Sequence, residues 1–319
     1  MSELPKQPFN ENLIVGFETA DDAGVYRLSD ELAIVQTLDF LPPIVDDPHD
    51  YGRVAALNSI NDVWAMAGTP VTAIAIACFP QSGIDPMTIQ EINCGGMEIL
   101  INHNIRLIGV HSVTNKEIMF GYSVTGVIDP RKIATNSGAR PDDVIVLTKP
   151  IGTGVISTGI KAQKTSEEIA AASLAVMLTP GAYAADLMRQ FGVRGATDVT
   201  GFALIGHAWE MACASKVTIE LDSSRVPIIS GARELAANGI LTANGKANRE
   251  YVGADIQIAE AVSKETRDLL FDPQTAGGML IAISPDRSEE LLERLCEKYP
   301  QAAIVGRVLK RGAHSIVVK

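Results

Sequence analysis

Short apolar runs rich in β-branched residues alternate with longer segments of helical spacing along the first 128 residues. The run Leu32–Leu38 has the length and content of a buried strand, whereas apolar residues on one face between Asp50 and Ala67 indicate a helix. Strands are expected at 25–27, 32–38, 71–79, 105–110 and 118–128, and helices at 50–67 and 85–102. This order predicts a mixed α/β layer with helices on one face of the sheet.

The second half of the chain has the same α/β (α+β) character. The length of 319 residues suggests about two domains. The loop-rich stretch Asn136–Asp143 separates the halves, so we expect domains at 1–140 and 141–319. Strands are expected at 144–148, 279–283, 302–309 and 314–318, helices at 165–178, 181–191 and 286–298, a further helix ending near Ser215, and a long loop at 238–257.

The composition excludes several classes of protein. Acidic residues outnumber basic ones, 38 to 27, which argues against sequence-independent nucleic-acid binding. The longest apolar run, Val71–Phe79, is far shorter than the ~20 residues of a membrane-spanning helix, so no membrane partner is expected. The first residues have no apolar signal region. The four cysteines are scattered without a CxxC motif, which disfavours a disulfide framework or a zinc cluster and favours a cytoplasmic location.

Acidic residues recur in three different local settings near the N-terminus. Asp21 and Asp22 lie in a turn, Asp39 is expected at a strand end, and Asp62 is expected on a helix face shared with Asn58. Each has an ordinary structural reading, respectively a turn, a strand end and a solvated helix face. Converging carboxylates repel one another unless a cation lies between them, and Mg²⁺ prefers such oxygen ligands. The sequence therefore predicts a Mg²⁺ site for a phosphate-bearing substrate.

Four further segments carry polar groups that either belong to a functional site or have an ordinary structural role. Asp198, before an expected helix, is either a fourth ligand or an N-cap. The segment Gly109–Ser112 is expected to be a loop whose backbone and hydroxyl groups contact phosphate, with His111 either contacting phosphate or satisfying a carbonyl group. Gly152–Gly154 opens a helix whose N-terminus attracts anions. His207 is expected to pack in a helix rather than to act in catalysis. The chain contains no P-loop, no Rossmann fingerprint and no evident nucleophilic triad.

A series of motifs resembles the selenophosphate synthetase (selenide, water dikinase) family, which is part of the aminoimidazole-ribonucleotide-synthetase-like superfamily. The resemblance spans nearly the whole chain. The motifs are Glu18-Thr-Ala-Asp-Asp-Ala-Gly-Val-Tyr26, Thr37-Leu-Asp39, Asn58-Ser-Ile-Asn-Asp-Val-Trp-Ala-Met66, Leu147-Thr-Lys-Pro-Ile-Gly-Thr-Gly154, Thr197-Asp-Val-Thr-Gly-Phe202 and Asp268-Leu-Leu-Phe-Asp-Pro-Gln-Thr275.

The resemblance implies a two-domain subunit in a homodimer, with the N-terminal sheets joined into a barrel. It implies that ATP, selenide and water give selenophosphate, AMP and phosphate, with selenide supplied directly or by a selenium-delivery protein. The matching metal ligands are Asp22, Asp62 and Asp198. The matching ATP-binding residues are Thr19, Ala20, Asp21, Asp39 and Asp62, together with Val110, His111 and Ser112, which would reach ATP bound to the partner subunit.

The sequence departs from the family pattern in several places. The family carries a glycine-rich loop with a Cys or selenocysteine and a Lys, which we expect upstream of this chain, because no Cys precedes Phe17 and Lys6 has no matching context. The catalytic residues are therefore unassigned. Val110, Thr114, Ala203 and Ala276 replace residues that are usually Gly, Asp, Gly and Ser. Two alternatives stay open: a related ATP-dependent kinase with another nucleophile, or a degenerate ATP-binding homologue acting as a regulator or dimer partner.

Overall fold

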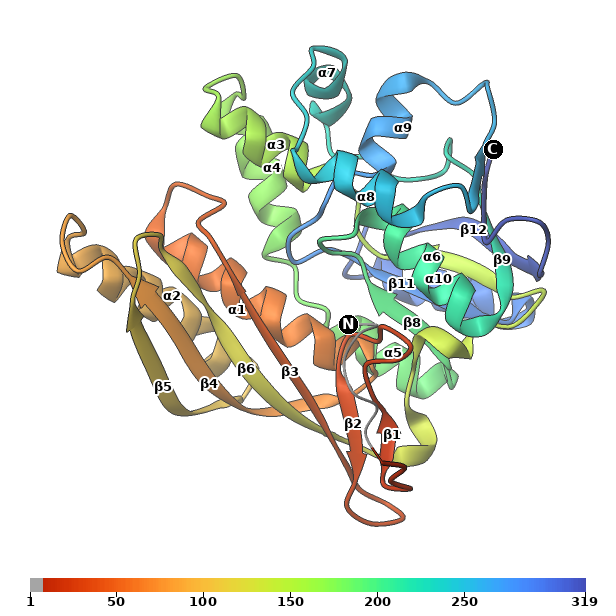
Figure 1. The fold of residues 1–319 in the computed structure, drawn as a ribbon, viewed down its shortest axis with the longest axis horizontal. Coiled ribbons are helices and arrows are strands. Elements are labelled where there is room, and N and C mark those ends of the chain that lie inside the picture. Colours follow the sequence, from red (N-terminus) through yellow and green to blue (C-terminus); the bar gives the residue numbers. More distant parts are fainter. Residues whose placement is uncertain (1–7) are drawn as a thin grey trace.

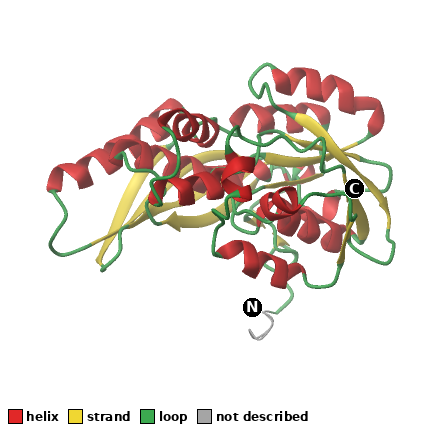
Figure 2. Cartoon of the chain, turned by 90° about the horizontal axis from the view of Figure 1, so that it is seen from above, coloured by secondary structure: helices red, strands yellow, loops and turns green. Residues whose placement is uncertain are grey.

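The computed structural model describes residues 8–319, so Lys6 lies outside the described residues. The N-terminal half forms a six-stranded sheet with the order β1-β2-β3-β6-β4-β5. Helices α1 (Pro48–Ala65) and α2 (Pro86–Asn102) pack on one face of this sheet, as the sequence predicts (Figures 1 and 2). The strands are β1 (Leu13–Val15), β2 (Gly24–Arg27), β3 (Ala33–Leu41), β4 (Thr69–Phe79), β5 (Arg106–Thr114) and β6 (Met119–Ile128).

Two strands extend beyond their predicted ends. β3 pairs with β6 as far as Leu41, so Asp39 lies within the strand and not at its end. β5 pairs in parallel with β4 through Thr114. His111 and Ser112 therefore belong to an edge strand, and the prediction of a loop at this place is wrong. In both cases continued pairing with a neighbouring strand extends the element, which a local pattern cannot reveal.

Helix α1 begins at Pro48, two residues before the predicted start at Asp50, and its N-cap is Asp47. The Asp47 carboxylate accepts a hydrogen bond from the Asp50 amide at 2.9 Å, and Pro48 occupies the first helical turn. Helices α1 and α2 approach closely through two glycines. A Cβ atom at Gly52 would lie 1.9 Å from the carbonyl oxygen of Ile92, and one at Gly95 would lie 1.9 Å from that of His49. The two helices therefore contact each other backbone to backbone.

The C-terminal half forms a seven-stranded sheet with the order β10-β13-β9-β12-β7-β11-β8. Its strands are β7 (Val144–Leu147), β8 (Gly195–Asp198), β9 (Val217–Leu221), β10 (Ile256–Ile258), β11 (Met279–Ile283), β12 (Ala303–Lys310) and β13 (Ile316–Val318). Its α-helices are α3 (Thr153–Lys161), α4 (Glu167–Met177), α5 (Ala182–Phe191), α6 (Ala203–Ser215), α7 (Ala232–Ala237), α8 (Asn244–Val252), α9 (Lys264–Leu270) and α10 (Pro285–Cys296), and short 3₁₀ turns occur at Pro130–Lys132 and Asn136–Gly138.

The predicted long loop at 238–257 is wrong, because it contains α8 and the start of β10. α8 is mostly polar and buries only Asn248 and Val252, so its apolar face is too sparse to give a helical pattern. Asp198 ends strand β8 and does not cap α6, whose N-cap position is Phe202. Among the described residues no single helix is long and apolar enough to span a membrane; α4 and α5, bent by 42° at their junction, pass that test only as a pair.

Side chains of α1 and α5 join the two halves of the molecule. Asn58 Oδ1 accepts a hydrogen bond from the Ala276 amide at 2.8 Å, and Asn61 Nδ2 donates to the carbonyl oxygen of Gly277 at 3.4 Å. Arg189 Nη1 donates to the carbonyl oxygen of Ala67 at 2.8 Å. Because α1 is enclosed between its sheet and the C-terminal half, nearly every residue from Tyr51 to Ala65 is buried. These contacts fix both walls of a cleft between the halves.

Candidate active site

The cleft has a volume of about 1110 Å³. One wall comes from the N-terminal half and carries Asp21, Asp22, Asp39 and Asp62. The opposite wall comes from β8, α6, α3 and α8. Its polar lining residues are Ser157, Thr158, Lys161, Asp198, Thr200, His207, Glu210, Thr242, Asn244, Asn248, Gln274 and Thr275. The fold thus brings carboxylates that are far apart in sequence to one concave site.

Hydroxyl groups orient the carboxylates predicted as metal ligands. Thr197 donates to Asp22 Oδ1 at 2.8 Å, and Thr37 donates to Asp62 Oδ2. The second oxygen of Asp22 and one oxygen of Asp198, Oδ2 in each case, are buried without a hydrogen-bond partner. A buried carboxylate oxygen without a partner is costly, so these atoms indicate a ligand that the folded chain itself does not provide.

Burial and mutual repulsion shift the acidity of these groups. Burial raises the pKa of Asp22 and of Asp62 well above the usual range, and the neighbouring Asp198 raises both further. Burial raises the pKa of Asp198 to about 7, although His207 opposes the shift, and burial raises the pKa of Asp39 to about 6 against the hydrogen bond from Asn58. The site therefore holds negative charge poorly without a cation.

Mg²⁺ fits this donor set. The lining carboxylates provide oxygen ligands, and the buried free oxygens of Asp22 and Asp198 are suited to a hard cation. Within residues 8–319 no three His, Cys, Asp or Glu side chains converge closely enough to hold an ion by themselves. Mg²⁺ commonly uses one or two carboxylates together with water and substrate phosphates, so the arrangement suits Mg²⁺ that arrives with a phosphate ligand.

Four of the five N-terminal residues predicted to bind ATP line the cleft: Ala20, Asp21, Asp39 and Asp62. Thr19 is not among the lining residues, but its hydroxyl group donates to the Asp21 carboxylate. The second oxygen of Asp21 accepts a hydrogen bond at 2.6 Å from the amide of Asn136. Thr19 therefore supports the orientation of Asp21 at the cleft wall.

Val110, His111 and Ser112 do not line this cleft. They lie on β5, the edge strand at the far end of the N-terminal sheet, and all three are exposed (Figure 1). The structure thus separates these three predicted ATP-binding residues from the carboxylates of the same chain.

His207 and Glu210 were not predicted as site residues, but both line the cleft and are 6% exposed. His207 is buried in helix α6, as expected, and it also lines the cleft. His207 Nδ1 lies 3.3 Å from Glu210 Oε2, an ion-pair distance without the alignment of a hydrogen bond. The sequence signal was their spacing of three residues on α6, directly after the motif that contains Asp198.

The helix N-terminus at Gly152–Gly154 is already occupied by side chains of the protein. Gln274 Oε1 accepts hydrogen bonds from the amides of Gly152 and Thr153, at 2.8 and 3.0 Å. Asp272 Oδ2 accepts one from the amide of Val155 at 3.0 Å. These contacts take the donors that the sequence suggested for an external anion. Asp272 thus plays the role expected of a bound anion at this helix.

Comparison with known proteins defines the class of this protein. The family description "AIR synthase related protein, N-terminal domain" matches residues 20–128, and "AIR synthase related protein, C-terminal domain" matches residues 140–319. A solved thiamine-monophosphate kinase from Stenotrophomonas maltophilia K279a covers 97% of this chain and 92% of its own, with a TM-score of 0.68 at 18% identity. The structure of the hydrogenase maturation protein HypE in complex with ATP has a TM-score of 0.66 at 18% identity. The match covers 97% of this chain and 86% of the HypE chain. These structures share the fold.

More similar relatives define the family within that class. Selenide, water dikinase 2 of Peptoclostridium acidaminophilum is 45% identical over 316 residues, which cover 99% of this chain and 90% of the relative. Selenide, water dikinase of Clostridioides difficile strain 630 is 43% identical over 319 residues, which cover 100% of this chain and 91% of the relative. The chain therefore belongs to the selenide, water dikinase family, and the predicted resemblance is confirmed.

Proposed function

We propose that this protein is an enzyme that makes selenophosphate from selenide, with ATP and water giving AMP and phosphate. The observation that carries the proposal is the near-full-length similarity to selenide, water dikinases, combined with a carboxylate-lined cleft suited to Mg²⁺ and phosphate. The alternatives of a different kinase or a degenerate ATP-binding homologue have less support, because the relatives that share 40–45% identity carry this one name.

In this proposal Asp22, Asp62 and Asp198 would hold Mg²⁺ together with the phosphates of ATP, and the bound metal would offset the charge of the phosphates so that a nucleophile can approach phosphorus. The cleft wall formed by Ala20, Asp21 and Asp39 positions ATP, and Thr19 orients Asp21. Lys149 is buried close enough to Asp198 to interact with its charge. Burial lowers its pKa to about 7, and its ammonium group donates to the carbonyl oxygen of Ala276 at 2.8 Å, which supports the turn beside Asn58.

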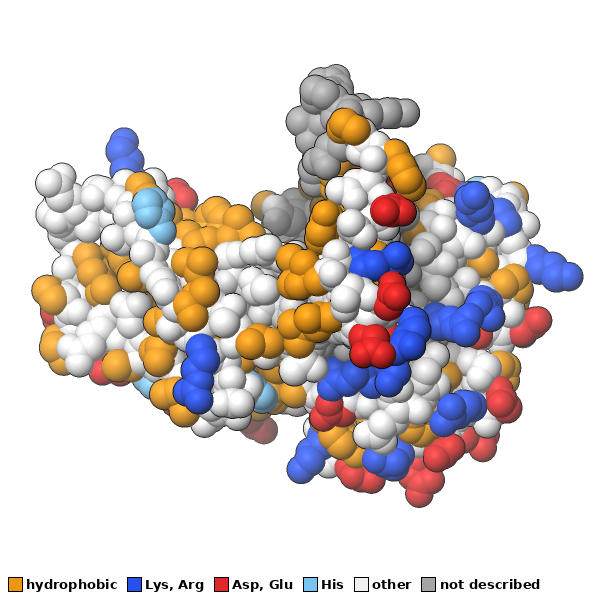
Figure 3. Space-filling model, turned by 90° about the horizontal axis from the view of Figure 1, so that it is seen from below, with side chains coloured by type: hydrophobic (Ala, Val, Ile, Leu, Met, Phe, Trp, Pro, Cys, Tyr) orange, Lys and Arg blue, Asp and Glu red, His pale blue; other side chains and the backbone are white. Residues whose placement is uncertain are grey.

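We also propose a homodimer in which the two N-terminal sheets form a barrel. Support comes from exposed apolar side chains on the sheet face away from α1 and on the edge strand β5 (Figure 3). They include Leu38, Ile74, Leu107, Ile108, Val110 and Val113. A second copy over this surface would cover the exposed edge strand. It would also bring Val110, His111 and Ser112 toward the partner subunit, where we propose that they reach ATP.

Three finer assignments belong to the same proposal. We place the domain boundary between residues 140 and 141, and the family matches to residues 20–128 and 140–319 support a boundary near this point. Selenide enters directly or from a selenium-delivery protein. The reaction takes place in the cytoplasm, a setting that suits the four free cysteines.

The experiment is ³¹P NMR of the full chain with ATP and Mg²⁺ under anaerobic conditions, with and without selenide. Selenophosphate and AMP that form only with selenide would support the proposed reaction. Phosphoryl transfer without selenide, or to another added nucleophile alone, would favour a different kinase. ATP that binds but remains intact in every sample would favour a regulator or dimer partner.

A further inference from the structure

A line of polar side chains runs from the surface of α8 to the cleft. Tyr251 donates a hydrogen bond to Glu210 Oε1 at 2.8 Å, and Glu210 Oε2 faces His207 Nδ1 at 3.3 Å. The other ring nitrogen of His207, Nε2, lies 3.2 Å from the hydroxyl oxygen of Thr200. Thr200 lines the cleft two residues after Asp198. We call these four residues the Thr200 relay; nothing in the proposed Mg²⁺ and ATP site uses them.

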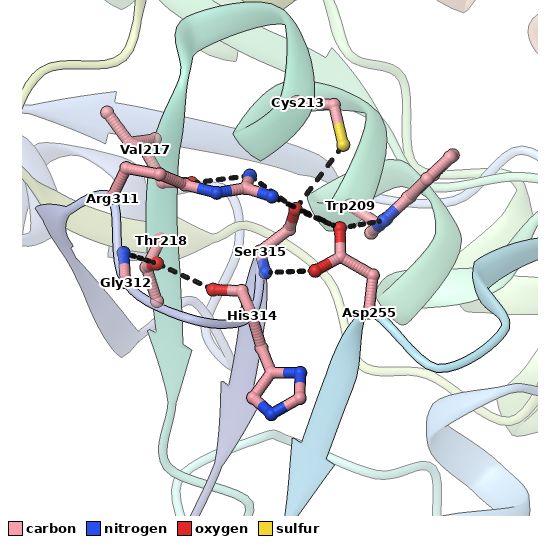
Figure 4. Close-up of polar contacts among 9 residues, drawn as sticks. All are labelled: Trp209, Cys213, Val217, Thr218, Asp255, Arg311, Gly312, His314 and Ser315. Carbon is pink, nitrogen blue, oxygen red and sulfur yellow. Dashed lines mark hydrogen bonds and ion pairs between the residues drawn. The ribbon is translucent and has the colours of Figure 1, made fainter.

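Aromatic packing holds the outer end of the relay. The ring of Tyr251 stacks on Phe202 with centroids 4.6 Å apart and meets the edge of Trp209 at 5.1 Å. Trp209 in turn donates to Asp255 at 3.0 Å, and Asp255 accepts a second hydrogen bond from the Ser315 amide at 2.8 Å (Figure 4). Tyr251 is thus held between two rings, one of which is tied to the C-terminal strands. The relay is anchored to the sheet at the end remote from the cleft.

The order of donors and acceptors in the relay sets the direction of the Thr200 hydroxyl. The carboxylate of Glu210 lies 3.3 Å from Nδ1 of His207, and at this distance, even without the alignment of a hydrogen bond, it favours a proton on Nδ1 because two lone pairs would repel. The tautomer with its single proton on Nδ1 presents Nε2 as an acceptor, and in that arrangement the Thr200 hydroxyl, 3.2 Å away, donates to His207. The lone pairs of the Thr200 oxygen are consequently free to accept a hydrogen bond from a group in the cleft.

We propose that Thr200 binds the water molecule that attacks phosphorus, and that His207, Glu210 and Tyr251 are positioning residues that keep Thr200 an acceptor. This inference rests on the proposed function, in which one phosphoryl group of ATP passes to selenide and another to water. An acceptor that orients the attacking water is a common requirement of phosphoryl transfer. The location fits, because Thr200 lines the same cleft wall as Asp198.

The step concerned is the one that releases orthophosphate. The water oxygen forms a bond to phosphorus while the bond from phosphorus to the departing AMP oxygen breaks, and one proton passes to solvent. Thr200 gains and loses no atoms; it accepts a hydrogen bond from the water. When water is poorly oriented, the nucleotide should stop at the diphosphate level after selenide has taken its phosphoryl group.

The test is rapid chemical quench of the full chain with ATP, Mg²⁺ and selenide, with separate quantification of selenophosphate, ADP, AMP and orthophosphate. Thr200→Val keeps the side-chain shape but removes the acceptor. We expect it to slow AMP and orthophosphate formation by about tenfold or more while ADP accumulates beside selenophosphate. Thr200→Ser should restore most of the AMP rate. Glu210→Gln, which can present an N–H group to Nδ1 of His207, should also raise the ratio of ADP to AMP.

His103→Asn is the matched control, because His103 packs against Trp64 and does not line the cleft. It should leave the ratio of ADP to AMP unchanged. The inference is overturned if Thr200→Val yields AMP and selenophosphate in the wild-type ratio, whether at the wild-type rate or with both products reduced equally. A wild-type chain that forms no selenide-dependent AMP would instead overturn the proposed function, so the two failures are distinguishable.

Discussion

Asp62 illustrates how a residue suited to metal binding lowers the stability of the metal-free fold. Its carboxylate is 7% exposed and lies near three other aspartates. Burial, followed by the charges of Asp198, Asp39 and Asp22, raises its pKa well above the usual 3.8. The folded state therefore binds a proton more tightly than the unfolded state does. Its contribution to stability is present at low pH and is lost as pH rises through the folded-state pKa.

Asp62→Asn should therefore stabilise the metal-free chain, increasingly so as the pH rises from about 5 to about 8, because the variant has no charge to bury. Urea denaturation at both pH values, in the presence of EDTA, measures the difference. The same variant should lose most Mg²⁺-dependent ATP binding. A variant that is less stable than the wild type at the higher pH, or one that still binds Mg²⁺ and ATP normally, would contradict this role.

At the residue scale, the sequence was sufficient to single out the acidic residues of the site, but not the residues that surround them in the folded chain. Asp22, Asp62 and Asp198 stand out because acidic residues beside apolar elements are unusual. Their convergence in one cleft follows from the tertiary fold, which no local pattern contains. The line from His207 through Glu210 to the cleft was not visible in the sequence, because Glu210 is held by Tyr251, which lies 41 residues away on α8. Such a long-range contact becomes visible only in the folded chain.

At the scale of elements, the end of α6 carries avoidable strain. Lys216 terminates this helix with a positive φ of 57°, a left-handed conformation in which a Cβ atom is unfavourable, and its side chain is exposed. Lys216→Gly should raise the free energy of unfolding by about 1 kcal/mol, measured by urea denaturation. Lys216→Ala is the matched control and should give little change, since it keeps the Cβ atom. Equal effects of both variants would contradict the explanation.

At the contact between α1 and α2, replacing a glycine is expected to lower the stability of the fold. A methyl group at Gly95 would overlap the backbone of α1 at His49, which cannot move like a flexible side chain. Gly95→Ala should lower the free energy of unfolding by about 3 kcal/mol. Gly83→Ala has open space around it but a positive φ of 87°, so it separates backbone strain from helix–helix overlap and should cost about 1 kcal/mol. A smaller loss for Gly95→Ala than for Gly83→Ala would be inconsistent with close helix packing.

Elements were predictable from sequence where local and tertiary preferences agree. Helix α2 begins at Pro86 after the Asp85 cap and ends at Asn102, in agreement with the prediction, because its capping residue is a local signal. Strand β11 spans Met279–Ile283 as predicted, since a fully apolar run after a glycine turn has few alternatives. Helix α8 was missed because its stability depends on a few buried contacts, including those of Asn248 with the carbonyl oxygens of Gly201 and Phe271.

For the whole molecule, the exposed apolar surface of the N-terminal sheet predicts self-association. Ile108 on β5 is 63% exposed, and a charge there would be buried without a partner in the proposed dimer. Ile108→Glu should convert the dimer to a monomer in light scattering coupled to size-exclusion chromatography. Ile101→Glu changes an equally exposed residue on α2, outside the sheet, and should leave the mass unchanged. A wild-type monomer, or a dimer that tolerates Ile108→Glu, would contradict the dimer model.

The most direct test of the account is calorimetric titration of the metal-free chain with Mg²⁺-ATP, at about pH 6.5, in two buffers with different ionisation enthalpies. Because burial raises the pKa of Asp39 to about 6 and of Asp198 to about 7, these carboxyl groups are partly protonated before binding. Binding should require Mg²⁺ and release protons from the protein, and Asp62→Asn should reduce that release. ATP that binds equally well with Mg²⁺ chelated, or Mg²⁺-ATP binding without net proton release, would contradict a carboxylate-lined Mg²⁺-ATP site.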